Sequence, residues 1–252
     1  MICALMIGRS GSVNFPGKNI HAVLGRPMCA YPLMAAKASR YISNTFVSTD
    51  SEIIGAVASE HGARLIRRPA ELATSSALGE LVFQHGYYEI KRQLAHANET
   101  IELWVLLFAN APTITADLID SGIEMLLGDP SLDSAVTTSV YNMWSPLRAR
   151  RLDENGCLQP FVPIESFGDP TTLNCDRDSQ GDVYFADMSV SIVRPRCMEK
   201  LEAGMLPQKW MGQRIVPIPS WGGCDVDYEW QMPIVEHWLL QHGFTSTADQ
   251  AK

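Results

Sequence analysis

Short apolar segments alternate with segments of helical periodicity along the first half of the chain. The pattern predicts strands at 2–7, 45–48, 64–66, 101–108 and 134–140, and helices at 32–39, 52–61, 78–95 and 116–127. The segment 102–108, "ELWVLLF", is apolar almost throughout, as a sheet covered on both faces requires. We therefore predict an α/β fold in which helices flank a mostly parallel sheet.

Residues from about 142 to 181 depart from this alternation, because they are rich in Arg, Asp, Pro and Gly and lack helical periodicity. A strand is predicted to follow at 183–193. We expect one domain over residues 1–252, in which residues 142–193 form an arm that leaves the sheet. Such an arm is suited to dimer contact or to substrate binding.

The last part of the chain is predicted to form a helix that follows an acidic stretch and ends at Gly243. Its apolar positions recur at a spacing of four, as on the packed face of a helix. They are Trp230, Ile234 and Trp238, with Val235 and Leu239 beside them.

The composition is that of an ordinary globular protein, since 46% of the 252 residues are apolar. The 28 acidic and 20 basic side chains give a net charge of -8, which argues against nucleic-acid or anionic-membrane binding and favours a small-molecule partner. No apolar run approaches the roughly 20 residues of a membrane span, and the first residues lack a signal-peptide pattern. The six scattered cysteines form no C-x-x-C pair, so we expect free thiols and a cytoplasmic location.

A loop rich in glycine and serine, "GRSGSVNFPGKN" at 8–19, follows the first predicted strand. Its backbone N–H groups can approach an anion closely, and Arg9 and Lys18 supply positive charge that matches a phosphate chain. The loop fits neither the G-x-x-x-x-G-K-[ST] nor the G-x-G-x-x-G pattern. From its residues alone, a solvated surface loop is an equal alternative.

The loop also resembles the signature of the acylneuraminate cytidylyltransferase family, which includes synthetases of CMP-sialic acid, CMP-legionaminic acid, CMP-pseudaminic acid and CMP-Kdo. Three further blocks are similar to the family in the same order: "FVSTDSEIIGAVASEHGA" (46–63), "RRPAELATSSA" (67–77) and "DVDYEWQ" (225–231). The resemblance implies a Rossmann-like sheet of the nucleotide-diphospho-sugar transferase type, with a strand-rich excursion for dimerisation. It also implies an enzyme that joins CTP to a 2-keto sugar acid for surface-glycan biosynthesis, releases pyrophosphate and uses Mg²⁺.

The resemblance assigns roles to residues of the loop and of the second block. Arg9 and Lys18 match the catalytic pair that binds the triphosphate and neutralises the departing pyrophosphate. Asn19 and Arg68 match positions that help to bind cytosine and ribose, although Arg68 could also be a surface arginine beside a helix. Weaker nucleotide contacts are expected from Ser10, Gly11 and Ser12.

Asp225 and Asp227 match the family's metal-binding pair. Two carboxylates two residues apart point the same way from an extended segment, and Mg²⁺ prefers such hard oxygen ligands. Asp227 could instead cap the helix that follows it. Asp50, at the end of a predicted strand, is interpreted mainly as a helix cap.

The chain departs from the family pattern where the acceptor sugar is expected. Val13 and Asn14 stand where the loop usually carries Lys-Gly, and Phe108 and Asn110 interrupt the common L-L-Q-P-T-S-P-L-R block. A phenyl ring forms no hydrogen bond with a glycerol or acetamido group, so the acceptor pocket must differ from one for sialic acid. The segment 186–192, "ADMSVSI", replaces an expected asparagine-glycine.

Two arginines of the predicted arm complete the set of candidate substrate contacts. Arg148 and Arg177 lie where the family keeps basic residues for the sugar carboxylate, and a solvated role is equally open for each.

Three functions compete at this point. The first is a CTP-dependent cytidylyltransferase that acts on a sugar acid, as a homodimer by resemblance. The second is a nucleotidyltransferase of the same fold with another acceptor or nucleotide, and the third is a catalytically silent, nucleotide-binding paralogue. Retention of Arg9, Lys18, Asp225 and Asp227 argues against the silent form.

Overall fold

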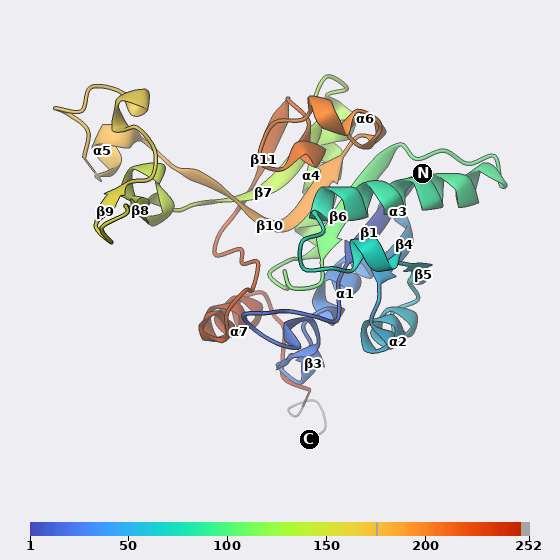
Figure 1. The fold of residues 1–252 in the computed structure, drawn as a ribbon. Coiled ribbons are helices and arrows are strands. Elements are labelled where there is room, and N and C mark those ends of the chain that lie inside the picture. Colours follow the sequence, from blue (N-terminus) through green and yellow to red (C-terminus); the bar gives the residue numbers. More distant parts are fainter. Residues whose placement is uncertain (175, 248–252) are drawn as a thin grey trace.

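A seven-stranded sheet forms the centre of the protein in the computed structural model, which describes residues 1–174 and 176–247 (Figure 1). Its strands, in spatial order, are β11 (Ile215–Ser220), β7 (Ser134–Val140), β10 (Tyr184–Val193), β6 (Leu103–Phe108), β1 (Ile2–Ile7), β4 (Ile42–Thr49) and β5 (Arg64–Arg67). Neighbouring strands are parallel except for β10, which runs antiparallel to both β6 and β7. The predicted mostly parallel sheet is therefore confirmed.

Helices cover both faces of this sheet. One face packs against α1 (Ala30–Ala38), α2 (Glu52–Glu60) and α4 (Ala116–Gly128), and the other against α3 (Gly79–Ala95) and α6 (Pro195–Glu199). Alternate residues of β1 enter the two cores: Ile2, Ala4 and Met6 on one side, and Cys3, Leu5 and Ile7 on the other. All six are buried, which explains why this strand is apolar throughout.

Smaller elements surround the sheet. The hairpin of β2 (Ala22–Val23) and β3 (Arg26–Pro27) adjoins α7 (Met232–Gln241), and the pair of β8 (Arg150–Leu152) and β9 (Leu158–Pro160) lies apart with α5 (Arg177–Gln180). The short 3₁₀ helices are η1 (Lys18–Ile20), η2 (Ala70–Leu72), η3 (Asn142–Trp144), η4 (Pro146–Arg148), η5 (Ile164–Phe167), η6 (Leu201–Ala203), η7 (Lys209–Met211) and η8 (Glu229–Gln231).

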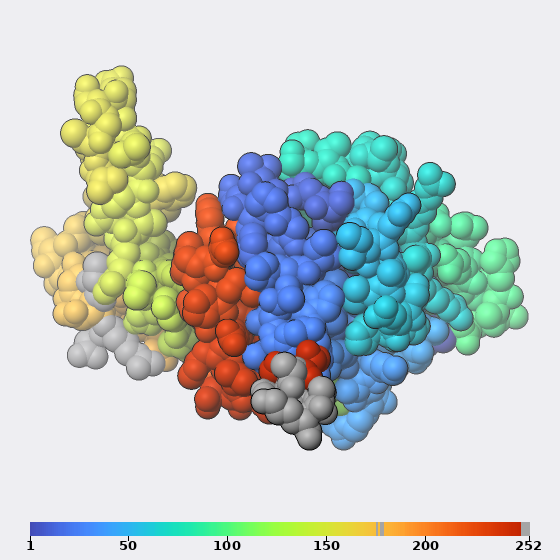
Figure 2. Space-filling model, turned by 90° about the horizontal axis from the view of Figure 1, so that it is seen from below, coloured from blue at the N-terminus to red at the C-terminus, as the bar shows by residue number. Residues whose placement is uncertain are grey.

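An arm leaves the body between β7 and β10 and carries β8, β9 and α5 (Figure 1 and Figure 2). The expected range 142–193 extends too far, because β10 returns to the sheet. Residues Ser191–Val193 pair with both β6 and β7, and Ile192 and Val193 are buried in the core. The arm proper is therefore shorter than the sequence pattern indicated.

Two features of the C-terminal third differ from the prediction. Strand β11 was missed, because Pro217 and Pro219 interrupt its pattern; both are tolerated here because β11 is an edge strand. Helix α7 buries Val235, Trp238 and Leu239 as expected. Trp230 and Ile234, by contrast, are 67% and 47% exposed, so the apolar stripe is narrower than predicted.

The cysteine prediction holds for the described residues, where Cys3, Cys29, Cys157, Cys197 and Cys224 are all free thiols. Cys175 lies outside the described residues. In the described part of the chain, none of the helices has both the length and the apolar character needed to cross a bilayer.

Candidate active site

The glycine/serine loop (residues 8–19) leaves the carboxyl end of β1, at the edge where parallel strands commonly bind ligands. Gly8 is needed for its start, because a Cβ there would lie 2.7 Å from the Cβ of Ala109. Gly17 has φ of 74°, a left-handed conformation that favours glycine, directly before η1. These two glycines fold the loop back so that Arg9, Lys18 and Asn19 line one cavity.

Asp50 ties this loop to the end of β4. The Ser10 backbone N–H and hydroxyl donate to the two carboxylate oxygens of Asp50 at 3.0 and 2.7 Å. Burial raises the pKa of Asp50, but the bonds from Ser10 outweigh it, so the pKa lies below its usual range. The predicted cap role of Asp50 is wrong: Ser51 caps α2 by accepting from the Ile54 N–H. The Ser10 side chain is bound to Asp50.

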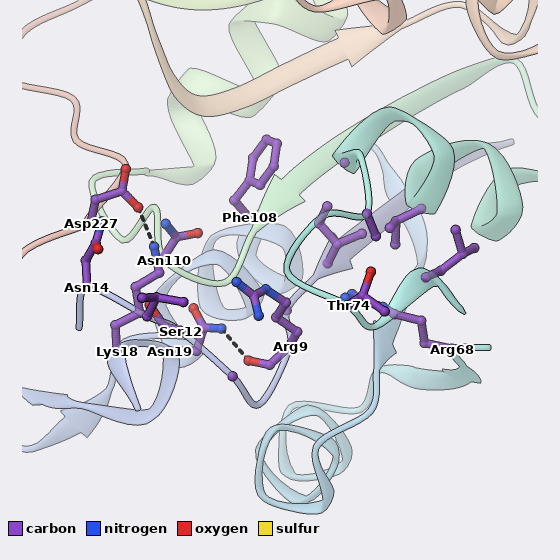
Figure 3. A pocket seen from close by; sticks show the side chains of 18 residues that line it. Arg9, Ser12, Asn14, Lys18, Asn19, Arg68, Thr74, Phe108, Asn110 and Asp227 are labelled. Carbon is purple, nitrogen blue, oxygen red and sulfur yellow. Dashed lines mark hydrogen bonds and ion pairs between the residues drawn. The ribbon is translucent and has the colours of Figure 1, made fainter. Parts of the chain in front are cut away.

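A cavity of about 290 Å³ opens between the loop, the end of β6 and residues 68–79 (Figure 3). We call it the cationic cavity, because Arg9, Lys18 and Arg68 line it. The Arg9 guanidinium points into it, and among the described residues no carboxylate or carbonyl pairs with this group. The remaining lining residues are Ile7, Gly8, Gly11, Ser12, Val13, Asn14, Asn19, Leu72, Thr74, Ala77, Gly79, Val82, Phe108, Asn110 and Asp227.

Lys18 joins the loop to residues 225–227, which we call the acid segment. Its ammonium lies 2.6 Å from Asp227 Oδ1 and donates to the Val226 carbonyl, also at 2.6 Å (Figure 3). The Lys18 side chain is only 13% exposed, whereas that of Asp227 is 57% exposed. The lysine is therefore held at the wall of the cationic cavity. The carboxylate of Asp227, by contrast, is accessible to a cation from solvent.

Arg68 is buried, which contradicts the alternative of a solvated surface arginine. Its guanidinium donates to the Ser48 carbonyl oxygen and, at 3.3 Å, to the Ser48 hydroxyl. Burial lowers the pKa of Arg68 to about 10, so the side chain remains charged at neutral pH. A fixed positive charge thus lies at the wall of the cavity.

Asn19 supplies an acceptor that the protein leaves unsatisfied. Its Nδ2 donates to the Arg9 carbonyl at 2.9 Å, whereas its buried Oδ1 has no hydrogen-bond partner among the described residues. Such an orphaned group is costly unless a ligand or water satisfies it. The Asn19 side chain lines the cationic cavity, so this amide belongs to the wall of the site.

Asn110, at the end of β6, contacts the acid segment from the other side. Its Nδ2 donates to the Asp225 carboxylate and to the Val226 carbonyl, the latter at 2.9 Å. Burial raises the pKa of Asp225 to about 6, and the charge of Lys18 opposes this effect. Asp225 and Asp227 both line a second cavity, and each has a different partner, Asn110 and Lys18 respectively.

A second cavity, of about 430 Å³, lies on the other side of Asp227. Both aspartates of the acid segment line it, together with Asp187, which is 3% exposed. Asp187 accepts hydrogen bonds from the Ser139 hydroxyl and the Ser189 N–H, each at 3.1 Å. The wall is completed by Trp144, Phe185, Ala186, Met188, Gln208, Gly223, Cys224 and Gln231. We call it the acidic cavity.

Sequence reasoning did not identify Asp187 as a site residue. A signal for Asp187 was present in the segment "ADMSVSI", because it stands where the family pattern has an asparagine-glycine pair. Met188 has φ of 65°, the left-handed conformation that glycine adopts easily and that costs other residues about 1 kcal/mol. Thr74 and Leu72 were also missed, although they lie in the block 67–77 and line the cationic cavity.

The remaining candidate substrate contacts lie in different parts of the structure. Phe108 lines the cationic cavity, with its ring packed edge-on against Phe83 at 5.1 Å. Arg148 is exposed on the arm and lines neither cavity. Arg177 begins α5, but its side chain lies outside the described part of the structure. In the described part of the chain, no histidine lines either cavity.

Comparison with known proteins agrees with this geometry. A sequence model of the family described as "Cytidylyltransferase" matches residues 3–146, more than half of the chain. N-acylneuraminate cytidylyltransferase A of Danio rerio is 37% identical over 96% of this chain and 52% of its own length. N-acylneuraminate cytidylyltransferase of Escherichia coli is 41% identical over 30% of this chain and 18% of its own length. The chain spans about half or less of the curated relatives that it matches.

The fold is also found among solved structures. That of CMP:2-keto-3-deoxy-manno-octonic acid synthetase complexed with CTP superposes with a TM-score of 0.64 over 96% of this chain and 99% of that one. The identity is 13%, so this likeness shows the fold alone. The resemblance seen in the sequence is confirmed by the family match: this chain belongs to the cytidylyltransferase family.

Proposed function

We propose that the protein is a CTP-dependent cytidylyltransferase that transfers CMP to a 2-keto sugar acid and releases pyrophosphate. The observation that carries this proposal is the cationic cavity at the end of β1, lined by Lys18 and by Arg9, whose guanidinium has no acidic partner among the described residues. A triphosphate matches this charge, since arginine and lysine bind phosphate oxygens through charge-assisted hydrogen bonds. The names of its relatives support the choice of CTP and of a sugar acid.

The cytosine nucleoside is assigned to the part of the cavity near Asn19 and Arg68. The unsatisfied Asn19 Oδ1 suits an N–H or O–H donor, and the cytosine amino group and the ribose hydroxyls are such donors. Uracil presents a carbonyl oxygen where cytosine presents its amino group. A contact from Asn19 Oδ1 to that amino group therefore favours CTP over UTP.

The acid segment fits a magnesium ion. Asp225 and Asp227 offer carboxylate oxygens to one cavity, and Mg²⁺ with phosphate ligands needs only one or two protein carboxylates. When bound, the ion would neutralise phosphate charge and polarise the phosphoryl group. The Lys18 ammonium lies beside Asp227 and would share that carboxylate with the ion.

Transfer requires the acceptor hydroxyl to attack the α-phosphorus in line with the departing pyrophosphate. A bond forms between the acceptor oxygen and the α-phosphorus, the acceptor hydroxyl releases its proton to solvent, and the bond from that phosphorus to the α,β-bridging oxygen breaks. Arg9 and Lys18 then stabilise the negative charge that develops on pyrophosphate. The acidic cavity, which shares Asp227 with the cationic one, is the proposed place of the acceptor.

The acceptor class is tested by product identification. The protein is incubated with CTP, Mg²⁺ and, separately, eight-carbon and nine-carbon 2-keto sugar acids and sugar 1-phosphates. We expect mass spectrometry to detect a CMP-sugar with one of the sugar acids. A product only with a sugar phosphate would instead support a nucleotidyltransferase of the same fold with another acceptor.

Exchange of Asp50→Ala is expected to weaken CTP binding about tenfold, because the loop loses both hydrogen bonds from Ser10. Isothermal titration with CTP measures the change. Ser51→Ala is the matched control: it removes the cap of α2, at a cost of about 1 kcal/mol in stability, but leaves the contact with Ser10. Equal CTP affinity of wild type and Asp50→Ala would exclude a role of Asp50 in holding the loop.

A homodimer formed through the arm is part of the proposal. The arm exposes large apolar side chains that a second copy can cover. They include Met143, Leu152, Leu158, Phe161 and Phe167, which are 45% to 68% exposed. A cytoplasmic location is supported by the free thiols, since reducing compartments keep cysteines unpaired.

A further inference from the structure

Asn110 holds the acid segment through both its side chain and its main chain. Its Nδ2 donates to the Asp225 carboxylate and to the Val226 carbonyl, and its own carbonyl accepts from the Val226 N–H at 2.9 Å. These three bonds connect the end of β6 with a segment 115 residues further along the chain. The acid segment therefore depends on Asn110 for its position relative to the sheet.

The two aspartates differ in what holds them. Lys18 binds the exposed Asp227, whereas Asn110 is the donor to the less accessible Asp225. The Val226 carbonyl accepts from both Lys18 and Asn110, at 2.6 and 2.9 Å. The acid segment is thus clamped between the glycine/serine loop on one side and β6 on the other.

A carboxylate that binds a metal through one oxygen is commonly oriented by a hydrogen bond to its other oxygen. The Asn110 amide donates to Oδ1 of Asp225, and an amide stays neutral, so it does not compete with a cation for the negative charge. An amide at this position therefore fixes the orientation of Asp225, whereas a lysine or arginine there would also neutralise it.

We propose that Asn110 is a positioning residue that orients Asp225 for a divalent cation and thereby sets the affinity of the acid segment for that cation. This inference rests on the proposed function, in which the cation is Mg²⁺. It replaces the sequence-based interpretation of Asn110 as a direct sugar contact. Asn110 acts through Asp225, so it is expected to change metal dependence more than the maximal rate.

The test compares Asn110→Leu, which removes the donor at similar volume, with Asn110→Gln, which keeps an amide. Mn²⁺ binding is measured by electron paramagnetic resonance on the full chain. We expect Asn110→Leu to weaken Mn²⁺ binding at least tenfold and Asn110→Gln to weaken it less. Asn155→Leu is the matched control: Asn155 is an exposed amide on the arm and lines neither cavity, so its exchange should leave Mn²⁺ affinity unchanged.

A second readout separates positioning from a general loss of structure. In pyrophosphate-release assays, the Mg²⁺ concentration for half-maximal rate should rise at least tenfold in Asn110→Leu, with the rate at saturating Mg²⁺ within about threefold of wild type. A lower rate that excess Mg²⁺ does not restore would overturn the proposal, as would equal Mn²⁺ affinity in wild type and Asn110→Leu.

The two proposals fail in different ways. If the wild type binds Mn²⁺ and Asn110→Leu loses this binding, but no nucleotide releases pyrophosphate, then Asn110 positions a metal ligand and the proposed function is wrong. If CTP turnover occurs and the exchange leaves Mn²⁺ affinity unchanged, then the proposed function stands and the role of Asn110 is wrong.

Discussion

Exchange of Lys18→Met is expected to lower kcat/KM for CTP by about 10²- to 10³-fold, the usual cost of removing a preorganised group that stabilises charge in the transition state. The Lys18 ammonium is held at the cavity wall by Asp227 and the Val226 carbonyl, so it needs little reorganisation to meet a triphosphate. Methionine keeps much of the length of the side chain and removes the charge. Steady-state pyrophosphate release measures the effect.

Two further variants test whether the loss of kcat/KM comes from the charge at position 18. Lys18→Arg keeps the charge and should recover part of the rate, although its planar group cannot reproduce both 2.6 Å contacts of the ammonium. Lys37→Met removes a lysine on the exposed side of α1, away from both cavities, and should leave kcat/KM unchanged. If kcat/KM of the Lys18→Met enzyme for CTP lay within threefold of the wild-type value, Lys18 would not have the assigned role in stabilising charge.

Exchange of Asp225→Ala or Asp227→Ala is expected to abolish metal-dependent turnover, a loss of at least about 10³-fold, because a bound metal ion contributes several kcal/mol to transition-state stabilisation. Both carboxylates line the acidic cavity, and in the described part of the chain only Lys18 pairs ionically with either of them. The measurement is the rate of pyrophosphate release as Mg²⁺ is increased.

Glu229→Gln provides the control for this pair. Glu229 is an exposed acid in η8, two residues beyond the acid segment, and lines neither cavity. Its exchange removes one negative charge from the same region and should preserve the Mg²⁺ dependence. Full activity of either aspartate variant with Mg²⁺ would mean that the metal is held elsewhere, and the assignment of the acid segment would be wrong.

The sequence predicted the part of the site that depends on local patterns. Strand β1 is buried on both faces, so its apolar run ends where the loop begins, and the glycines at 8 and 17 mark the turn. The spacing of Arg9 and Lys18 followed from the same stretch. These residues are close in the chain, which is why their proximity could be read from it.

Contacts between distant segments could not be predicted in the same way. The bond from Asn110 to Asp225 spans 115 residues, and that from Ser10 to Asp50 spans 40. The family resemblance gave Asn110 the role of a sugar contact, and residue type at a strand end gave Asp50 that of a cap. Tertiary packing assigned other partners, because each polar group binds the nearest complementary group in the folded chain.

The exposed face of α7 and the missed strand β11 have a related cause. Periodicity identifies apolar residues, but the neighbouring elements decide which of them are buried, and Trp230 in η8 and Ile234 in α7 are left 67% and 47% exposed. The prolines of β11 disfavour a strand in general and are compatible with one only at a sheet edge, which the order of the strands determines.

The central claim is that the cationic cavity binds CTP for cytidylyl transfer, and the most direct test is pyrophosphate release from CTP, UTP, ATP and GTP, each with Mg²⁺ and the same mixture of 2-keto sugar acids. The account predicts release with CTP at least tenfold faster than with UTP, because the unsatisfied Asn19 Oδ1 accepts from the amino group of cytosine and would meet a carbonyl oxygen in uracil. It also predicts faster release with CTP than with ATP or GTP, since the proposed reaction is cytidylyl transfer. Equal or faster release with UTP or a purine nucleotide, or no release with any of the four, would contradict it.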